Sequence, residues 1–232
     1  MDIKRYLALT ASEFAASDTL PEPPAWMACH FSSYGTGLSN IPDTLPSGSM
    51  IIVNDRTPPH GHDQNKIAQQ LNLLASKFNI QYFLLDFQQE NNQETASLVA
   101  ELPDKIDGTV AVTEAYANYS NCPVFLTCPL PHQRLTDSIK QWHGRELWLE
   151  LGAESEIITI TDKEARIEFL QENILSEKDR IDASLHSRYR TEIFEGHARI
   201  TLERSPRELL ALLEEASAHG IKIAVGLYQQ FM

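Results

Sequence analysis

Short apolar runs alternate with amphipathic segments along most of the chain, which predicts repeated strand–helix units. Seven of these runs have the length and composition of strands, and most are apolar at nearly every position. Runs of that kind are typical of parallel strands buried on both faces. The expected strands are 26–33, 49–55, 81–88, 108–116, 123–128, 146–151 and 221–227.

Between the strands, apolar residues recur at helical spacing in four segments. The clearest covers 64–78 and follows Asp63, a favourable N-cap residue. The last begins after Ser205 with Pro206 in its first turn, and we expect it to end at Gly220. The other two are a segment around Val99 and the segment 132–143.

The rhythm changes in the C-terminal third. Segments 156–161 and 197–202 alternate with period two, as half-exposed antiparallel strands do, and the charged stretch 163–194 reads as part helix and part loop. We therefore predict one α/β domain over 1–232, an irregular or incomplete TIM-like (β/α) barrel. It would have about seven parallel strands plus an antiparallel hairpin. An open doubly wound sheet is the alternative, although no glycine-rich phosphate loop follows the first strand.

Charge and cysteine content narrow the choice of partners. The chain has 232 residues and a formal net charge of -13, which argues against nucleic acid and anionic membranes as partners. Its three cysteines form no CxxC pair and suit a reducing compartment. The apolar run 6–13 is shorter and more polar than a signal peptide. We expect a cytoplasmic protein that binds a small molecule and needs no cofactor or metal.

Four carboxylates fall at the ends of four expected strands: Asp55, Asp86, Glu114 and Glu150. In a parallel α/β barrel, functional groups gather at the carboxyl ends of the strands. Strand alternation places Asp86 with Gln88 on one face, and Glu114 with Tyr116 on one face, so all four could point into one cavity. Further candidates for binding a ligand there are His30, Tyr34, Arg56, Tyr228 and Gln229.

This residue set suits carbohydrate chemistry. Glycoside hydrolysis needs one carboxyl as an acid and a second group that stabilises or attacks the sugar centre. Aromatic side chains offer a platform to a sugar ring, and amides and carboxylates bind its hydroxyl groups. The alternative is that each carboxylate caps a helix or pairs with an arginine.

The segment Leu84-Leu85-Asp86-Phe87-Gln88 resembles the strand-end Asp-aromatic-Glu signature of chitinase-like (family 18) glycoside hydrolases. The resemblance implies a TIM barrel in which Asp86 orients the substrate's acetamido group and the last position protonates the leaving group. Here Gln88 stands at that position, and a glutamine cannot act as the acid. The acid is then lost or supplied elsewhere, with Glu90 and Glu114 as candidates. We expect Glu114 to be the general acid.

Two other chemistries compete at the same end of the strands. Asp55, His60, His62 and Asp63 could supply metal ligands, but their loop lacks the helical spacing that fixes two imidazoles. We expect a polar loop there, with Asp63 as an N-cap.

A cysteine–histidine enzyme is the other competing possibility. Cys29 or Cys128 could be a nucleophile activated by His30 or His132. Both cysteines lie in apolar strand runs, where we expect small core residues.

The sequence thus favours a glycoside hydrolase-like protein that acts on or binds a small carbohydrate at the strand ends. The alternative is a non-catalytic barrel descendant that binds a small molecule or a protein partner. A third possibility is a barrel enzyme that acts on an amine or a phosphorylated metabolite.

Overall fold

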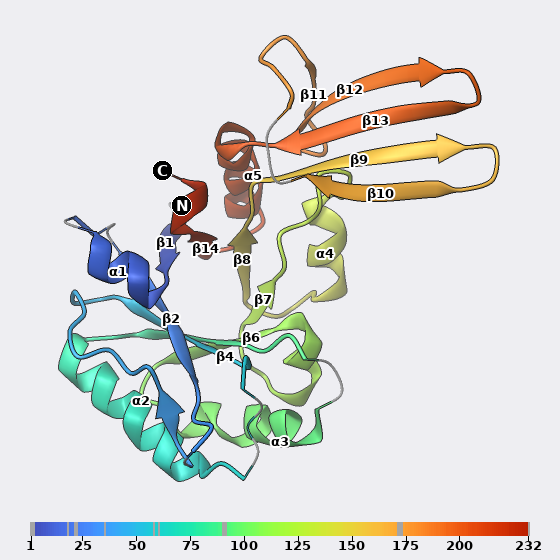
Figure 1. Cartoon of the computed structure of the whole chain (residues 1–232). Coiled ribbons are helices and arrows are strands. Elements are labelled where there is room, and N and C mark those ends of the chain that lie inside the picture. Colours follow the sequence, from blue (N-terminus) through green and yellow to red (C-terminus); the bar gives the residue numbers. More distant parts are fainter. Residues whose placement is uncertain are drawn as a thin grey trace.

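A computed structural model describes residues 3–17, 19–20, 23–34, 36–57, 59, 61–89, 92–170 and 174–231. In this part of the chain, eight parallel strands close into a barrel, and a five-stranded antiparallel sheet projects from it (Figure 1). The barrel strands, in order, are β1 (Lys4–Leu9), β2 (Pro24–Phe31), β4 (Met50–Asn54), β5 (Tyr82–Asp86), β6 (Thr109–Thr113), β7 (Val124–Leu126), β8 (Leu147–Leu151) and β14 (Ile223–Leu227). Strand β1 closes the barrel by pairing with both β14 and β2. The short β3 (Leu38–Ser39) pairs antiparallel with β2.

Alternation along the barrel strands produces two apolar layers. One set of side chains fills the barrel interior, including Tyr6, Ile52, Leu84, Phe125 and Trp148. The alternate set faces the surrounding helices and forms the larger cluster. Because both faces of each strand are buried, the strand sequences are continuously apolar, which is why they were recognisable.

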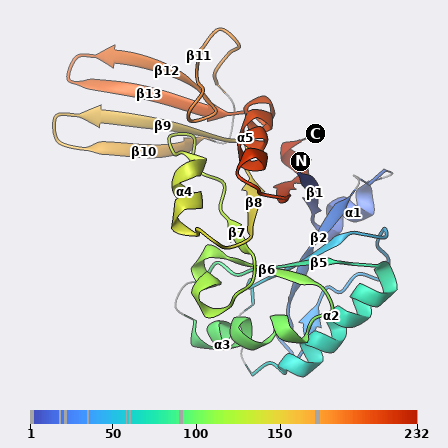
Figure 2. The same cartoon turned by 180° about the vertical axis from the view of Figure 1, so that it is seen from behind.

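Most of the helices lie around the outside of the barrel, as Figure 2 shows from behind, whereas the short first helix lies at the carboxyl end of β1. The helices are α1 (Ala11–Ala16), α2 (Gln64–Phe78), α3 (Gln93–Glu101), α4 (Leu135–Gln141) and α5 (Pro206–Ala218). Three short 3₁₀ helices are η1 (Pro103–Lys105), η2 (Glu114–Tyr119) and η3 (Tyr228–Gln230). Helix α2 begins as expected, because the Asp63 carboxylate accepts the backbone N–H groups of Asn65 and Lys66. None of the helices in the described residues is both long and apolar enough to cross a membrane.

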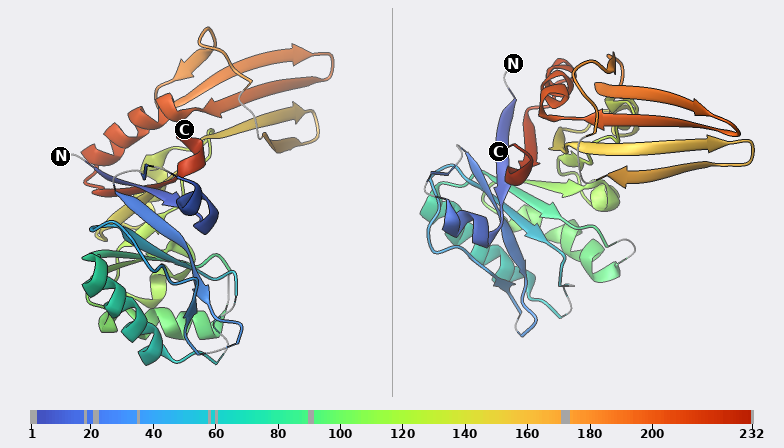
Figure 3. Two further views of the ribbon diagram at one scale, coloured as in Figure 1. Left: turned by 60° about the vertical axis from the view of Figure 1, so that its left-hand side comes forward. Right: turned by 45° about the horizontal axis from the view of Figure 1, so that its top comes forward.

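The second sheet is an insertion between β8 and α5. Its strands are β9 (Glu154–Thr161), β10 (Ala165–Leu170), β11 (Arg180–Asp182), β12 (Ser187–Phe194) and β13 (His197–Arg204), in the order β10-β9-β13-β12-β11. Both views in Figure 3 show it extending away from the barrel.

The predicted α/β TIM-like barrel is confirmed, and three details of the prediction are corrected. The barrel has eight strands rather than seven, because the run at β1 belongs to it. The C-terminal insertion is a five-stranded sheet rather than a hairpin. The stretch 163–194, expected as helix and loop, supplies β10, β11 and β12 in its described residues. In these mostly exposed strands, charged residues alternate with apolar ones, so no continuous apolar run marks them as strands in the sequence.

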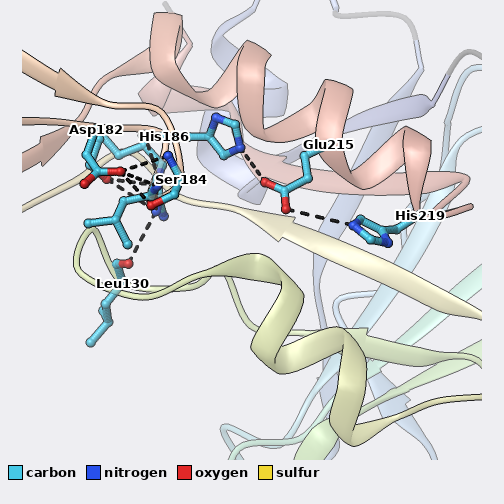
Figure 4. Close-up of polar contacts among 9 residues, drawn as sticks. Leu130, Asp182, Ser184, His186, Glu215 and His219 are labelled. Carbon is cyan, nitrogen blue, oxygen red and sulfur yellow. Dashed lines mark hydrogen bonds and ion pairs between the residues drawn. The ribbon is translucent and has the colours of Figure 1, made fainter.

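Buried charged groups fix the insertion to the barrel. Arg188 Nη2 lies 2.8 Å from Glu208 Oε1 of α5, and both side chains are almost fully buried. His186 donates to Glu215 of the same helix (Figure 4). Arg204, which has no exposed surface, donates to backbone carbonyl groups in the loop after β7 and in the turn before β12. The sheet is therefore held at its base while its far end stays exposed.

Candidate functional site

A cavity of about 840 Å³ opens at the carboxyl ends of the barrel strands. Its floor is the top of the barrel interior, where Ile52, Leu84, Phe125 and Val225 contribute apolar surface. Polar side chains surround this floor: Thr10, Ser12, His30, Asn40, Asn54, Asp55, Arg56, Asp86, Gln88, Glu150, Glu154 and Gln230. An apolar floor with a polar rim is the composition of a site for a small polar ligand.

The Asp86–Gln88 pair lies at the end of β5, on the wall of this cavity. Gln88 Nε2 donates to Asp86 Oδ1 at 2.5 Å, so the two side chains act as one hydrogen-bonded unit. Burial raises the pKa of the Asp86 carboxyl; the Gln88 amide opposes that shift and the charge of Asp55 adds to it. Glu90, the nearest alternative acid along the chain, lies outside the described residues.

Asp55, the residue directly after β4, supports this pair. Its Oδ2 accepts the backbone N–H groups of Gln88 at 2.9 Å and Gln89 at 2.7 Å, and its carbonyl accepts the Gln89 side-chain amide. The side chain of Asp55 is only 6% exposed. Its carboxylate is therefore committed to holding the end of β5 in place.

Glu150 and Glu154 contribute a second acidic group across the barrel, on β8 and at the start of β9. Glu150 Oε2 accepts the backbone N–H of Cys128 at 3.1 Å. Burial raises the pKa of both carboxyls; the charges of Asp86 and Glu154 add to the shift at Glu150, whereas Arg204 opposes it at Glu154. Like Asp86, these two groups are cavity carboxyls whose pKa is raised by burial, as a general acid requires.

Glu114, expected as the general acid, does not line the cavity. Strand β6 ends at Thr113, and Glu114 opens η2, so strand alternation no longer sets its direction. Its carboxylate accepts the Trp142 indole N–H at 2.9 Å and the Thr127 backbone N–H at 3.0 Å. The expectation that Glu114 shares the cavity with Asp86 is corrected, and the site proposed below does not use Glu114.

The expected tyrosine platforms also lie outside the cavity. Tyr116 is 1% exposed and donates its hydroxyl to the Gln89 carbonyl, so it is a core residue beneath the β5 loop. Tyr34 is fully exposed in a surface turn. Tyr228 is half-buried and Gln229 exposed in η3, where the neighbouring Gln230 lines the cavity instead.

Of the other candidates, His30 and Arg56 line the cavity as expected. His30 Nε2 lies 3.2 Å from the Asn40 amide, and the Asn54 amide donates to the Met27 carbonyl. Asn40 and Asn54 were not anticipated. The position of Asn54 directly before Asp55 at a strand end was the available signal.

The metal and cysteine alternatives gain no support. Among the described residues, no three His, Cys, Asp or Glu side chains are grouped to hold a metal ion. His62 Nε2 lies 3.2 Å from the Ser32 carbonyl oxygen, and His60 lies outside the described residues. The Cys29 thiol points to the Asn40 carbonyl, and burial raises its pKa to about 12, opposite to what a nucleophile needs. Burial also raises the pKa of Cys128.

Several solved structures have a similar overall fold. The spore cortex-lytic enzyme SleL of Bacillus cereus superposes with a TM-score of 0.58 at 10% identity, over 97% of this chain and 70% of that one. A chitinase from Chromobacterium violaceum gives 0.55 at 10% identity, over 98% and 94%. Chitinase ChiW from Paenibacillus sp. gives 0.58 at 9% identity, over 98% and 41%.

The expected resemblance to chitinase-like (family 18) glycoside hydrolases is thus confirmed for the fold. No family model matches the sequence. No curated protein matches it either. At such low identity the likeness concerns the fold, and function rests on the residues of the site.

Proposed function

We propose that this chain binds a short carbohydrate in the cavity at the strand ends. Family 18 enzymes cleave their substrate with an acid that follows the strand-end Asp, and because Gln88 stands at that position here, we expect no cleavage by that route. The observation that carries the proposal is the Asp86–Gln88 pair, which occupies the wall of the cavity with an amide at the expected acid position. An amide donates and accepts hydrogen bonds, as sugar hydroxyl groups require, but it has no acidic proton to give a leaving group.

The groups around the pair support binding. One oxygen of Asp86 accepts from Gln88, which leaves the other to accept from a sugar hydroxyl or amide N–H. Asn54 and Gln230 lie on the same rim and Phe125 on the floor, so a ring could rest on apolar surface while amides meet its edge.

A second candidate function is hydrolysis with Glu150 as the acid. It is favoured by the raised pKa of the Glu150 carboxyl, because a general acid has to be protonated near working pH. Asp86 would then be the second carboxyl of the reaction. This alternative differs from the proposal in one testable respect, which is turnover.

Binding is tested by isothermal titration calorimetry with N-acetylglucosamine oligomers and with their free-amine counterparts. Loss of one hydrogen bond to a charged group weakens binding about 10- to 100-fold, so Asp86→Asn is expected to lower the affinity by that factor. Asp107→Asn makes the same change at the exposed opposite end of the barrel and should bind like the wild type. Equal affinity of Asp86→Asn and wild type would contradict the proposed site.

Turnover is tested with chromogenic glycosides of the same oligomers. We expect no release by the wild type and measurable release by Gln88→Glu, which restores a carboxyl at the acid position. Release by the wild type that disappears in Glu150→Gln would instead establish the second candidate. The cytoplasmic location inferred from the sequence stays a prediction. Short oligomers are suitable probes whether the protein works inside or outside the cell.

A further inference from the structure

Strand β10 forms one free edge of the inserted sheet (Figure 1). Within the described chain its strand partner is β9, and five of its six residues are exposed. An edge strand presents a row of unpaired N–H and C=O groups, which are a template for another strand. The segment 165–170 contains no proline, and its pairing with β9 runs without a bulge, so nothing in β10 itself blocks such an addition.

The hairpin that joins β9 to β10 shows to which side the backbone N–H and C=O groups of each β10 residue point. The Thr161 N–H donates to the Glu164 carbonyl at 2.9 Å, so the polar groups of Glu164 point toward β9. Backbone polar groups of successive strand residues point to opposite sides. Those of Ala165, Ile167 and Phe169 therefore point to the free edge.

We propose that two copies of this chain pair through β10 in antiparallel orientation, about a two-fold axis at Ile167. In this register Ile167 lies opposite its own copy, Ala165 lies opposite Phe169 of the second copy, and Arg166 lies opposite Glu168 of the second copy. The residues whose polar groups point to the free edge then face one another, as hydrogen bonding across the edge requires.

The strand complements itself in charge and in size. The two-fold axis repeats the Arg166–Glu168 pairing, so both charged residues of β10 meet an opposite charge. The small Ala165 side chain lies across from the large Phe169 ring. A shift of one residue along the strand would turn the free-edge groups away from each other and would place side chains of opposite faces together.

The two faces of the sheet agree with this pairing. Ile167 is opposite Ile158 of β9, which is in turn opposite Ile200 of β13, so the three lie in one row on one face. Ile167 and Phe169 are 44% and 62% exposed on this face. Pairing through β10 extends the apolar row across the axis and covers these side chains with those of the second copy. Arg166 and Glu168 lie on the opposite, charged face.

The test is sedimentation equilibrium from low to high micromolar concentration. We expect the wild-type mass to rise from 26.2 kDa toward twice that value. Arg166→Glu and Glu168→Arg each place like charges opposite one another twice, so each should raise the dissociation constant at least about tenfold. The double variant exchanges the two charges and should return to wild-type association.

An equimolar mixture of the two single variants provides the decisive comparison. Glu at 166 and 168 of one chain meets Arg at 166 and 168 of the other, so the mixture should form a heterodimer although neither variant self-associates. Heterodimer formation also establishes that both variants are folded. Lys222→Glu, an exposed change of equal charge outside the inserted sheet, should leave the wild-type dimer unchanged.

Two results would overturn the proposal. If the wild type stays monomeric at the highest concentration, two copies do not pair through β10, and the strand of another protein would be the remaining candidate partner of that edge. A wild-type dimer that neither single variant weakens would place the dimer contact elsewhere on the surface.

Discussion

Replacing Asp55 by alanine removes the acceptor that holds two neighbouring backbone amides at the wall of the cavity. The Asp55 carboxylate accepts from Gln88 N at 2.9 Å and from Gln89 N at 2.7 Å, and it is 6% exposed. A hydrogen bond to a charged group contributes about 1.5–3 kcal/mol. Gln88 and Gln89 are exposed, so water can reach the freed N–H groups, and we expect a net loss of about 2–4 kcal/mol from the two bonds.

The assay is urea unfolding followed by far-UV circular dichroism. With an m-value of about 2–3 kcal/mol/M, the midpoint should fall by about 1 M at an unchanged slope. Asp55→Asn keeps one neutral acceptor oxygen and should lose about half as much. Asp107→Ala, at the exposed opposite end of the barrel, is the control and should stay within about 0.5 kcal/mol of the wild type. A loss for Asp55→Ala as small as that of the control would refute the role given to the carboxylate.

The same contacts and pKa shifts support three further expectations. Burial raises the pKa of Glu150 above its value in the unfolded chain, so protonation of this carboxyl favours the folded state. The free energy of unfolding should therefore rise as the pH falls through the folded-state pKa toward the ordinary value of 4.5. Glu150→Gln should reduce this rise and increase the free energy of unfolding at pH 7. Glu208→Gln leaves the buried Arg188 charge without its ionic partner and should cost about 3–5 kcal/mol in chemical unfolding. Cys29, with a pKa raised to about 12, should react with a thiol reagent at neutral pH only on unfolding, and rapid labelling of the native protein at that thiol would contradict its burial.

The barrel was predictable from the sequence because its strands are buried on both faces and therefore carry continuous apolar runs. Strand β1 was not predicted as a barrel strand, because it begins with the charged residues Lys4 and Arg5 and is followed by a helix of only six residues. Strand β10 was not predicted because its side chains alternate between charged and apolar on an exposed sheet, a pattern that short charged loops can share.

The lining of the candidate site was predictable only where regular strand geometry extends to the candidate residue. Asp86 is the last residue of β5, and Glu150 lies within β8, so strand position placed both correctly at the cavity. Glu114 and Tyr116 lie in η2, where the chain turns away and tertiary contacts set the side-chain directions. Glu154 lines the cavity from the start of the insertion, whose path no local pattern specified.

The inserted sheet enters and leaves the barrel at a single point. Glu154 begins β9, Arg204 ends β13, and the two are directly opposed in the antiparallel ladder. Opposed residues of such a ladder lie about 5 Å apart, a distance that a tight turn can span. The insertion is thus a self-contained cassette: a turn joining Glu154 to Arg204 would excise it and leave an ordinary β8–α5–β14 unit. Glu208 and Glu215 of α5, whose partners Arg188 and His186 belong to the cassette, are barrel residues that such an excision would leave without these partners.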